Sequence, residues 1–170
     1  MQLMLIDAFK YKQWSDQRLA DAAMKIDKVS FPHAIAFIRQ QLNHMVRVEE
    51  LFQARLTGGP VPHLSTNTEM VPEFDALMQR VHASNHWYMR YTESLEDCRY
   101  QEAVSFEFVD GRNGKMTRQE ILFHVINHGT YHRGAMGHCL DLAGVPHPAD
   151  TFTVFIHTAE PMRRESGVLN

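Results

Sequence analysis

Three histidines stand four residues apart in the segment HVINHGTYHRG (residues 124–134): His124, His128 and His132. Imidazole nitrogens can bind a divalent metal, carry protons near neutral pH, or pack in a core with a single hydrogen bond. If the segment is helical, four residues advance the chain by about 6 Å, which places His124 and His132 about 12 Å apart. One ion at about 2.0–2.1 Å from each nitrogen cannot bind all three, but it can bind an adjacent pair.

Helical geometry favours His128 and His132 as that pair. At about 100° per residue, the apolar positions of this helix form one face that includes Ile121 and Val125. His132 lies within the face and His128 lies on its edge, whereas His124 falls further out. We therefore expect His124 to be a neighbour of the site or a surface residue.

A third ligand must come from another helix. In QQLNHMVRVEELF (residues 40–52), His44 shares one side of the predicted helix with Val48 and Leu51, and most polar residues lie on the other side. His82 and His86 form a rival pair with no evident partner. An isolated histidine on an apolar face is most often a hydrogen-bonded core residue, whereas metal sites in helix bundles use side chains from facing helices.

Nearby polar residues are candidates for a role around the site. Glu49 and Asp16 could lie close to it, because ligating histidines usually donate their second ring N–H to a carboxylate, a carbonyl or water. Tyr131 and Arg133 flank His132 and are expected to point away.

The elements that must position these residues are four long amphipathic helices. Gly58-Gly59-Pro60 ends the second helix, and Ser30 is its expected N-cap. Thr117 and Glu120 form a capping box at the start of the fourth. The predicted helices cover about residues 3–27, 30–57, 70–98 and 117–144.

Residues 104–117 change period from helical to alternating and predict a short β-hairpin, with its turn at Asp110-Gly111 or Asn113-Gly114. The segment FTVFIH (residues 152–157) is expected to form a strand or to cover the bundle. The sequence thus predicts an all-α protein, a four-helix bundle with a short β-hairpin before the last helix, as a single domain over residues 1–170.

Composition excludes several classes of function. The 170 residues are 44% hydrophobic and 22% charged, and the formal net charge of −3 argues against a nucleic-acid partner. No apolar run approaches the roughly 20 residues of a membrane span. Asp7 and Lys10 interrupt the apolar N-terminus, so a signal peptide is not expected. Cys98 and Cys139 form no disulfide framework, and we expect a cytoplasmic protein with reduced thiols.

The segment TRQEILFHVINHGTYHRGAM (residues 117–136) resembles the signature of the DinB/YfiT-like superfamily of metal-dependent enzymes, in which a His precedes Asn-His and then His-Arg-Gly. YKQWSDQRL (residues 11–19) and LNHMVRVEELFQARLTG (residues 42–58) are similar to its two earlier motifs, so the resemblance extends from about residue 5 to 145. Members often have Gln after His-Arg-Gly, where this chain has Ala135.

The resemblance implies a bundle with up-down-down-up connectivity and metal ligands at His44, His128 and His132. It also implies a divalent ion (nickel, zinc or manganese), a homodimer, and a small-molecule substrate such as a low-molecular-weight thiol. Relatives use mycothiol or bacillithiol in S-transfer or in isomerisation. Three histidines leave a position open for water or thiolate, which is typical of catalytic sites.

We therefore expect a metal-dependent enzyme, a thiol S-transferase or a hydrolase. Two other functions stay open at this point. One is a metal-binding or stress-response protein without catalysis, and the other is a bundle whose histidines are satisfied by hydrogen bonds alone.

Overall fold

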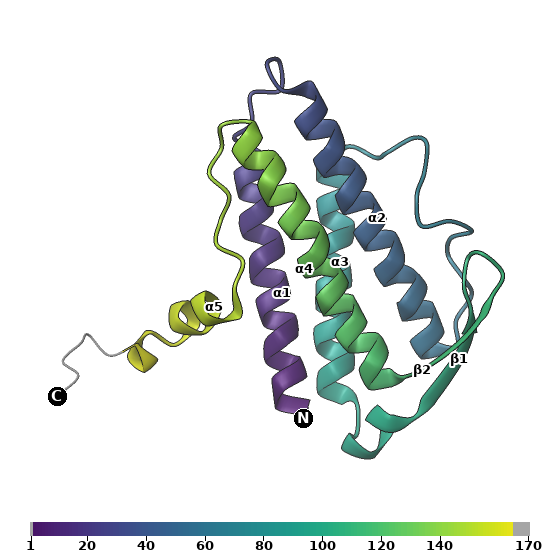
Figure 1. Cartoon of the computed structure of the whole chain (residues 1–170). Coiled ribbons are helices and arrows are strands. Elements are labelled where there is room, and N and C mark those ends of the chain that lie inside the picture. The colour runs from purple at the N-terminus through teal and green to yellow at the C-terminus, as the bar shows by residue number, and fades with distance from the viewer. Residues whose placement is uncertain (1, 165–170) are drawn as a thin grey trace.

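Four long helices form a bundle in the computed structural model, which describes residues 2–164 (Figure 1). They are α1 (Gln2–Ala23), α2 (Pro32–Thr57), α3 (Phe74–Ser94) and α4 (Arg118–Leu142). α1 and α2 each pack against both α3 and α4. In Figure 1, α1 and α4 run upward and α2 and α3 run downward, so the connectivity is up-down-down-up. The loop over residues 58–73 returns the chain to the top of the bundle and allows α2 and α3 to be parallel.

The helix ends follow local sequence signals with one exception. Gly58 ends α2 in the left-handed region at φ 70°, and Thr117 and Glu120 form the predicted capping box of α4. The prediction that Ser30 caps α2 is wrong. The N-cap is Phe31, and Pro32 occupies the first turn, where its fixed φ suits a helix start. The Ser30 hydroxyl instead donates to Asp27 Oδ2 at 2.6 Å.

α3 is shorter than predicted, because the chain becomes extended at Leu95 before a short 3-10 helix (Asp97–Gln101). The hairpin then follows as β1 (Ala103–Glu107) and β2 (Asn113–Thr117), which pair antiparallel with Phe106 opposite Gly114. Its turn contains Gly111 at φ 82°, so Asp110-Gly111 forms the turn and Asn113-Gly114 belongs to β2.

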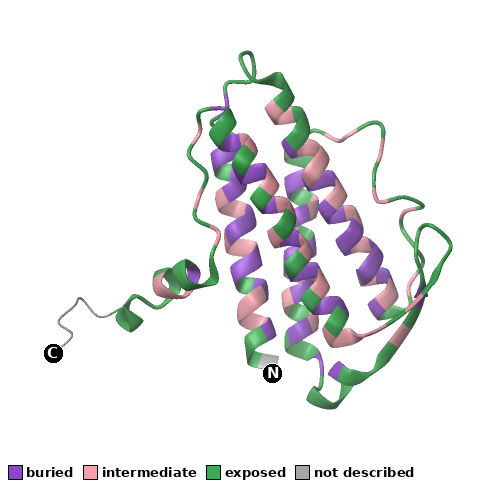
Figure 2. Ribbon diagram, viewed as in Figure 1, coloured by how far each residue is buried: buried purple, intermediate pink, exposed green. Residues whose placement is uncertain are grey.

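Buried residues occur along all four long helices (Figure 2), and the hydrophobic ones form two clusters. One contains Leu42 of α2, Leu77 of α3 and Leu140 of α4. The other contains Phe9 of α1 and Val125 of α4, and it continues under the hairpin. Between them each of the four long helices contributes buried polar side chains: Lys12, Asp16, Glu49, Asn85 and Arg133. This set is called the buried polar layer below, and it lies at mid-height of the bundle.

The C-terminal segment forms a short helix rather than a strand, α5 (Phe152–Ala159), followed by a 3-10 turn (Pro161–Arg163). Of the two alternatives for FTVFIH, the strand is wrong. Phe155 is buried against α1, where its ring centroid lies 6.0 Å from that of Tyr11 and 5.6 Å from that of Trp14. Aromatic packing of this kind favours a helix that presents one apolar side.

Within residues 2–164, the helices are too short or too polar to cross a lipid bilayer.

Candidate metal centre

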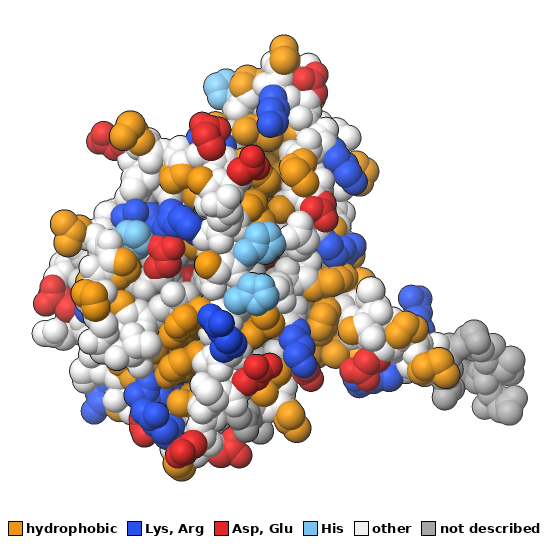
Figure 3. Space-filling view, turned by 180° about the vertical axis from the view of Figure 1, so that it is seen from behind, with side chains coloured by type: hydrophobic (Ala, Val, Ile, Leu, Met, Phe, Trp, Pro, Cys, Tyr) orange, Lys and Arg blue, Asp and Glu red, His pale blue; other side chains and the backbone are white. Residues whose placement is uncertain are grey.

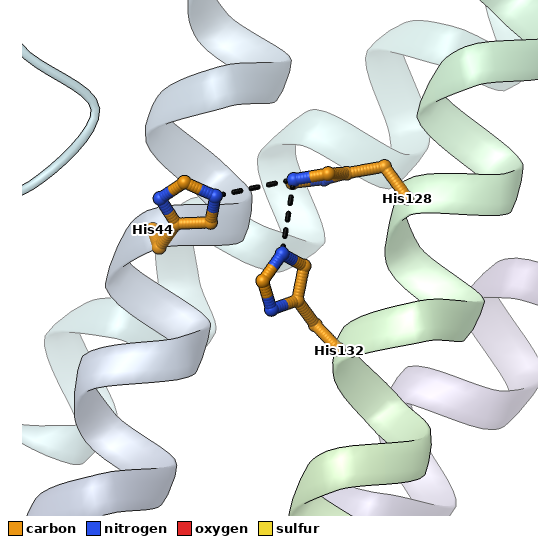
Figure 4. Close-up of side chains that lie close together, drawn as sticks. All are labelled: His44, His128 and His132. Carbon is orange, nitrogen blue, oxygen red and sulfur yellow. Dashed lines mark hydrogen bonds between the residues drawn. The ribbon is translucent and has the colours of Figure 1, made fainter.

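The three candidate ligands meet in the gap between α2 and α4 (Figure 4). His44 reaches across from α2, and His128 and His132 lie one turn apart on α4. His128 Nε2 lies 3.1 Å from His44 Nε2 and 3.0 Å from His132 Nε2. One nitrogen from each ring lies within 4.8 Å of the other two, and all three side chains are partly buried. The structure thus brings together the three residues that the sequence singled out.

The spacing of His128 Nε2 from the nitrogens of His44 and His132 fits a shared metal ion. Two nitrogens bound to one ion at about 2.0–2.1 Å lie roughly 2.9–3.4 Å apart in octahedral to tetrahedral geometry. Hydrogen bonding accounts less well for the arrangement, because His128 Nε2 offers one lone pair or one proton to two neighbouring nitrogens. A cation at the centre of the three nitrogens would satisfy all of them at once.

Gln41 fixes the orientation of one ring. Its side-chain oxygen lies 2.6 Å from His132 Nδ1 and accepts the proton of that nitrogen. In a neutral imidazole the other nitrogen then carries a lone pair, so His132 Nε2 presents its lone pair to His128. Such an outer hydrogen bond is characteristic of histidines that bind metals. The residues named for this role from the sequence, Asp16 and Glu49, are both carboxylates, and Gln41 was not among them.

Electrostatics keep the rings neutral. Burial lowers the pKa of His128 to about 3, and the neighbouring rings of His132 and His44 add to the shift. Burial also lowers the pKa of His132 to about 4, with a further contribution from His44. Burial lowers the pKa of His44 as well, although hydrogen bonds to the Thr66 backbone and the Asn67 side chain oppose that shift. Neutral imidazole is the form that binds metals.

The buried polar layer lies directly behind the histidines. Lys12 Nζ lies 2.9 Å from Asp16 Oδ2 and 2.8 Å from Glu49 Oε1. Arg133 Nη1 lies 2.9 Å from Asp16 Oδ1, and Arg133 Nε lies 2.7 Å from Asp150 Oδ2. Buried charges are tolerated when each has a close partner of opposite charge, so these contacts hold α1, α2, α4 and the C-terminal loop in fixed relation.

Arg133 points away from the three histidines, as expected, but it points into the bundle rather than to solvent. The residue is 2% exposed, and it lies inside because two carboxylates are there to pair with it. Burial disfavours its charge, but Asp16 and Asp150 outweigh that effect and raise its pKa. Tyr131, on the other side of His132, is exposed as expected. α4 therefore turns His132 toward α2 and the next residue, Arg133, toward α1.

Gly129 makes room for this layer. A Cβ atom at this position would lie 3.0 Å from Arg133 Nη1 and 3.4 Å from Lys12 Cε. These two cations are fixed by ion pairs and cannot move aside freely. The glycine between His128 and the two cations thus allows α4 to approach the layer closely.

The remaining predicted residues have other places. Asp16 and Glu49 are buried in the polar layer and bind Lys12 rather than a candidate ligand. His124 stacks on His128, with ring centroids 5.4 Å apart, and stays outside the group of three. The rival pair His82 and His86 lies on α3, where no metal-binding group of three forms within the described residues.

A cavity of about 340 Å³ opens beside His44 and His128. It lies between the second half of α2, the start of α4 and the hairpin, and apolar side chains form most of its wall. We call it the hairpin cavity. A ligand in this cavity has direct access to two of the three histidines.

On the face of the molecule that points away from the viewer in Figure 1, acidic, basic and hydrophobic side chains are intermixed (Figure 3). The basic side chains on this face are therefore interrupted by acidic ones, unlike the continuous basic surface that phosphate backbones select.

The fold and the site together define a four-helix bundle with a candidate three-histidine metal centre. The family model of the DinB family matches residues 1–165, and the chain belongs to this family. No curated protein and no solved structure shows significant similarity to the chain. Family membership and the histidine cluster are both compatible with metal binding.

Proposed function

We propose that His44, His128 and His132 bind one divalent metal ion and that this ion is the cofactor of an enzyme. The observation that carries the proposal is the convergence of three ring nitrogens at metal-binding spacing beside a cavity. Three neutral ligands leave coordination positions free, as in catalytic rather than structural sites. Nickel, zinc and manganese are the ions to test, because histidine nitrogens suit several divalent metals and availability decides among them.

The reaction class that we favour is thiol transfer or hydrolysis of a small molecule. A divalent cation in this position would supply Lewis acidity, lowering the pKa of a coordinated water or thiol toward neutrality. The chain contributes the rest. Gln41 holds the His132 ring, the buried polar layer fixes α4 against α1, and the hairpin cavity shelters a substrate from water. Resemblance to relatives that use low-molecular-weight thiols supports a small thiol as co-substrate.

Elemental analysis tests the metal first. Protein purified without a polyhistidine tag or a nickel column should contain close to one divalent ion per chain, and a His44→Ala variant should have lost it. Metal-loaded protein is then assayed with a panel of small thiols plus electrophiles and a panel of esters. Turnover that disappears on chelation and returns with the metal would support the enzyme. Loaded protein without turnover on either panel would leave metal binding as the function.

We further propose that the chain forms a homodimer through the side of the bundle where α1 and α4 meet. A second apolar hollow there is lined by exposed Met4 and Phe123 and by Phe152 of α5. Exposed apolar patches of this kind mark protein interfaces. Sedimentation analysis of the wild type beside Phe123→Glu tests it: a dimer should dissociate in the variant, whereas a wild-type monomer would exclude it.

A further inference from the structure

The hairpin cavity has an aromatic wall that begins at the candidate ligands. The His124 ring lies 5.4 Å from His128 and 5.1 Å from Phe52, measured between ring centroids. Phe52 lies 5.7 Å from Phe106, which lies 4.9 Å from Phe108. Successive contacts at these distances are favourable edge-to-face or offset aromatic pairs. A continuous aromatic surface thus extends from the histidines to the hairpin, and Phe108 is still 45% exposed.

Most of the rest of the wall is apolar too, with Val48 and Leu51 of α2 and Met116 of β2, and its polar members are Arg55, Thr66 and Glu107. Small-molecule sites have this character: a mostly apolar hollow with a few polar groups that fix the orientation of the ligand. The cavity volume of about 340 Å³ lies within the range of roughly 300–1,000 Å³ found for such sites. It suits a ligand with one aromatic ring and a short chain.

A single cation stands in the wall at the end away from the histidines. Arg55 Nη2 donates to the backbone oxygen of Glu107 at 2.6 Å. Among residues 2–164, Arg55 forms no ion pair, and the Glu107 carboxylate is not within pairing distance of it. Its remaining N–H donors are thus free for an anion, which guanidinium groups bind through two parallel hydrogen bonds.

The two ends of the cavity are separated by the length of a small molecule. His44 and Arg55 are three turns apart on α2, or about 16 Å along the axis. Both side chains lean toward the N-terminus of α2, so the lean leaves this separation largely unchanged. A ligand that contacts both ends of the cavity must therefore be elongated.

We propose that the hairpin cavity binds an elongated organic acid, with its carboxylate at Arg55, its aromatic or branched apolar body along Phe52 and Phe106, and its opposite end at His44 and His128. The inference rests on the proposed function in one respect, since the reacting group would be the end that meets the metal. It adds the substrate class to that function, and it assigns Arg55 as the residue that selects the anion. In the rival orientation, the carboxylate would bind the metal directly.

The test uses 4-phenylbutyrate and its neutral counterpart 4-phenylbutan-1-ol as probes, with binding measured by calorimetry on metal-free protein. Arg55→Met should weaken 4-phenylbutyrate about tenfold and leave the alcohol within about twofold. Phe108→Ala should weaken both probes alike, by about threefold or more. Arg112→Met is the matched control for Arg55→Met. It removes an exposed arginine charge from the hairpin, at a position that does not line the cavity. Equal binding of 4-phenylbutyrate to wild type and Arg55→Met would overturn the proposal.

A second measurement decides the orientation. In protein loaded with Mn²⁺, the phenyl protons of bound 4-phenylbutyrate should relax faster than the methylene protons next to its carboxylate. Faster relaxation of those methylene protons would place the carboxylate on the metal and refute the role of Arg55. If elemental analysis finds no bound Mn²⁺, the proposed function fails, while the effect of Arg55→Met on metal-free protein still decides whether the cavity binds the acid.

Discussion

His132 and Gln41 meet across the gap between α4 and α2, with His132 Nδ1 2.6 Å from Gln41 Oε1. The contact determines which nitrogen of His132 keeps its lone pair, and that nitrogen is the one that faces His44 and His128. It also joins the two helices that carry the candidate ligands. A residue outside the group of candidate ligands thereby orients one of them.

Replacing Gln41 by Leu should weaken metal binding by about 10–100-fold, because the His132 ring loses the partner that orients it. Gln41→Glu should retain affinity, since a carboxylate also accepts the Nδ1 proton. Competition with a chromogenic chelator measures the dissociation constants. Gln17→Leu, a glutamine of α1 that bonds to Asp21, serves as control. Unchanged affinity in Gln41→Leu would mean that the ring is held by packing alone.

Removing both α4 ligands should abolish metal binding. The double variant His128→Ala/His132→Ala leaves a single ligand, His44, which cannot hold an ion at micromolar concentration. The matched control is His82→Ala/His86→Ala, which deletes the same spacing of histidines from α3 and should keep the full metal content. Elemental analysis after dialysis compares the two. Loss of metal in the control rather than in the α4 variant would move the site to α3.

Lys12→Met should lower the free energy of unfolding by about 3–5 kcal/mol, because Asp16 and Glu49 would remain buried without their shared cation. The surface ion pair of Lys10 with Asp7 provides the comparison, and Lys10→Met should cost roughly 0–1 kcal/mol. Urea unfolding of metal-free protein measures both. Equal effects of the two substitutions would show that the buried polar layer contributes no more than a surface pair.

Metal-free protein should lose stability as the pH falls from about 6.5 toward 3. Burial and neighbouring rings lower the pKa of His128 to about 3 and that of His132 to about 4 in the folded chain, whereas unfolded histidines titrate near about 6.5. In this range the unfolded chain takes up protons that the folded chain does not, so acid favours unfolding.

The measurement is the urea midpoint across this pH range in the presence of a chelator. His128→Gln removes one of the titrating groups and should flatten the dependence, while the acidic residues titrate in both proteins. A curve of identical slope in His128→Gln would contradict the assigned cause.

Much of the fold follows from local signals along the chain. The capping box at Thr117 and the left-handed Gly58 mark helix ends that short-range hydrogen bonds determine. The grouping of His44 with His128 and His132 was predictable because helical periodicity places each of them on an inward-facing side. The start of α2 was not predictable in this way, because the Ser30 hydroxyl donates to Asp27. Local capping rules fail when a side chain has such a nearer acceptor.

The sequence placed Asp16 and Glu49 near the site, but the pairing of these carboxylates with Lys12 and Arg133 in a buried polar layer was not predicted. In α1 the buried line passes through Leu5, Phe9, Lys12, Asp16 and Leu19, at the three- and four-residue spacing of a core face. Trp14 lies off this line and packs against Phe155. Arg133 likewise falls about 20° from Leu140 on the helical wheel. The signal was the interruption of an apolar line by opposite charges, and only tertiary pairing makes such residues stable inside.

The hairpin has a further consequence for how this protein can be changed. Phe106, Phe108 and Met116 shape one side of the cavity, and the two strands pack against α2 and α4 with Phe106 buried in the hydrophobic cluster. Gly114 leaves the space in which the rings of Phe106 and Phe108 lie. If Phe106 is kept, changes at the exposed hairpin positions should alter the shape offered to a ligand and leave the three candidate ligands and the ion pairs behind them in place.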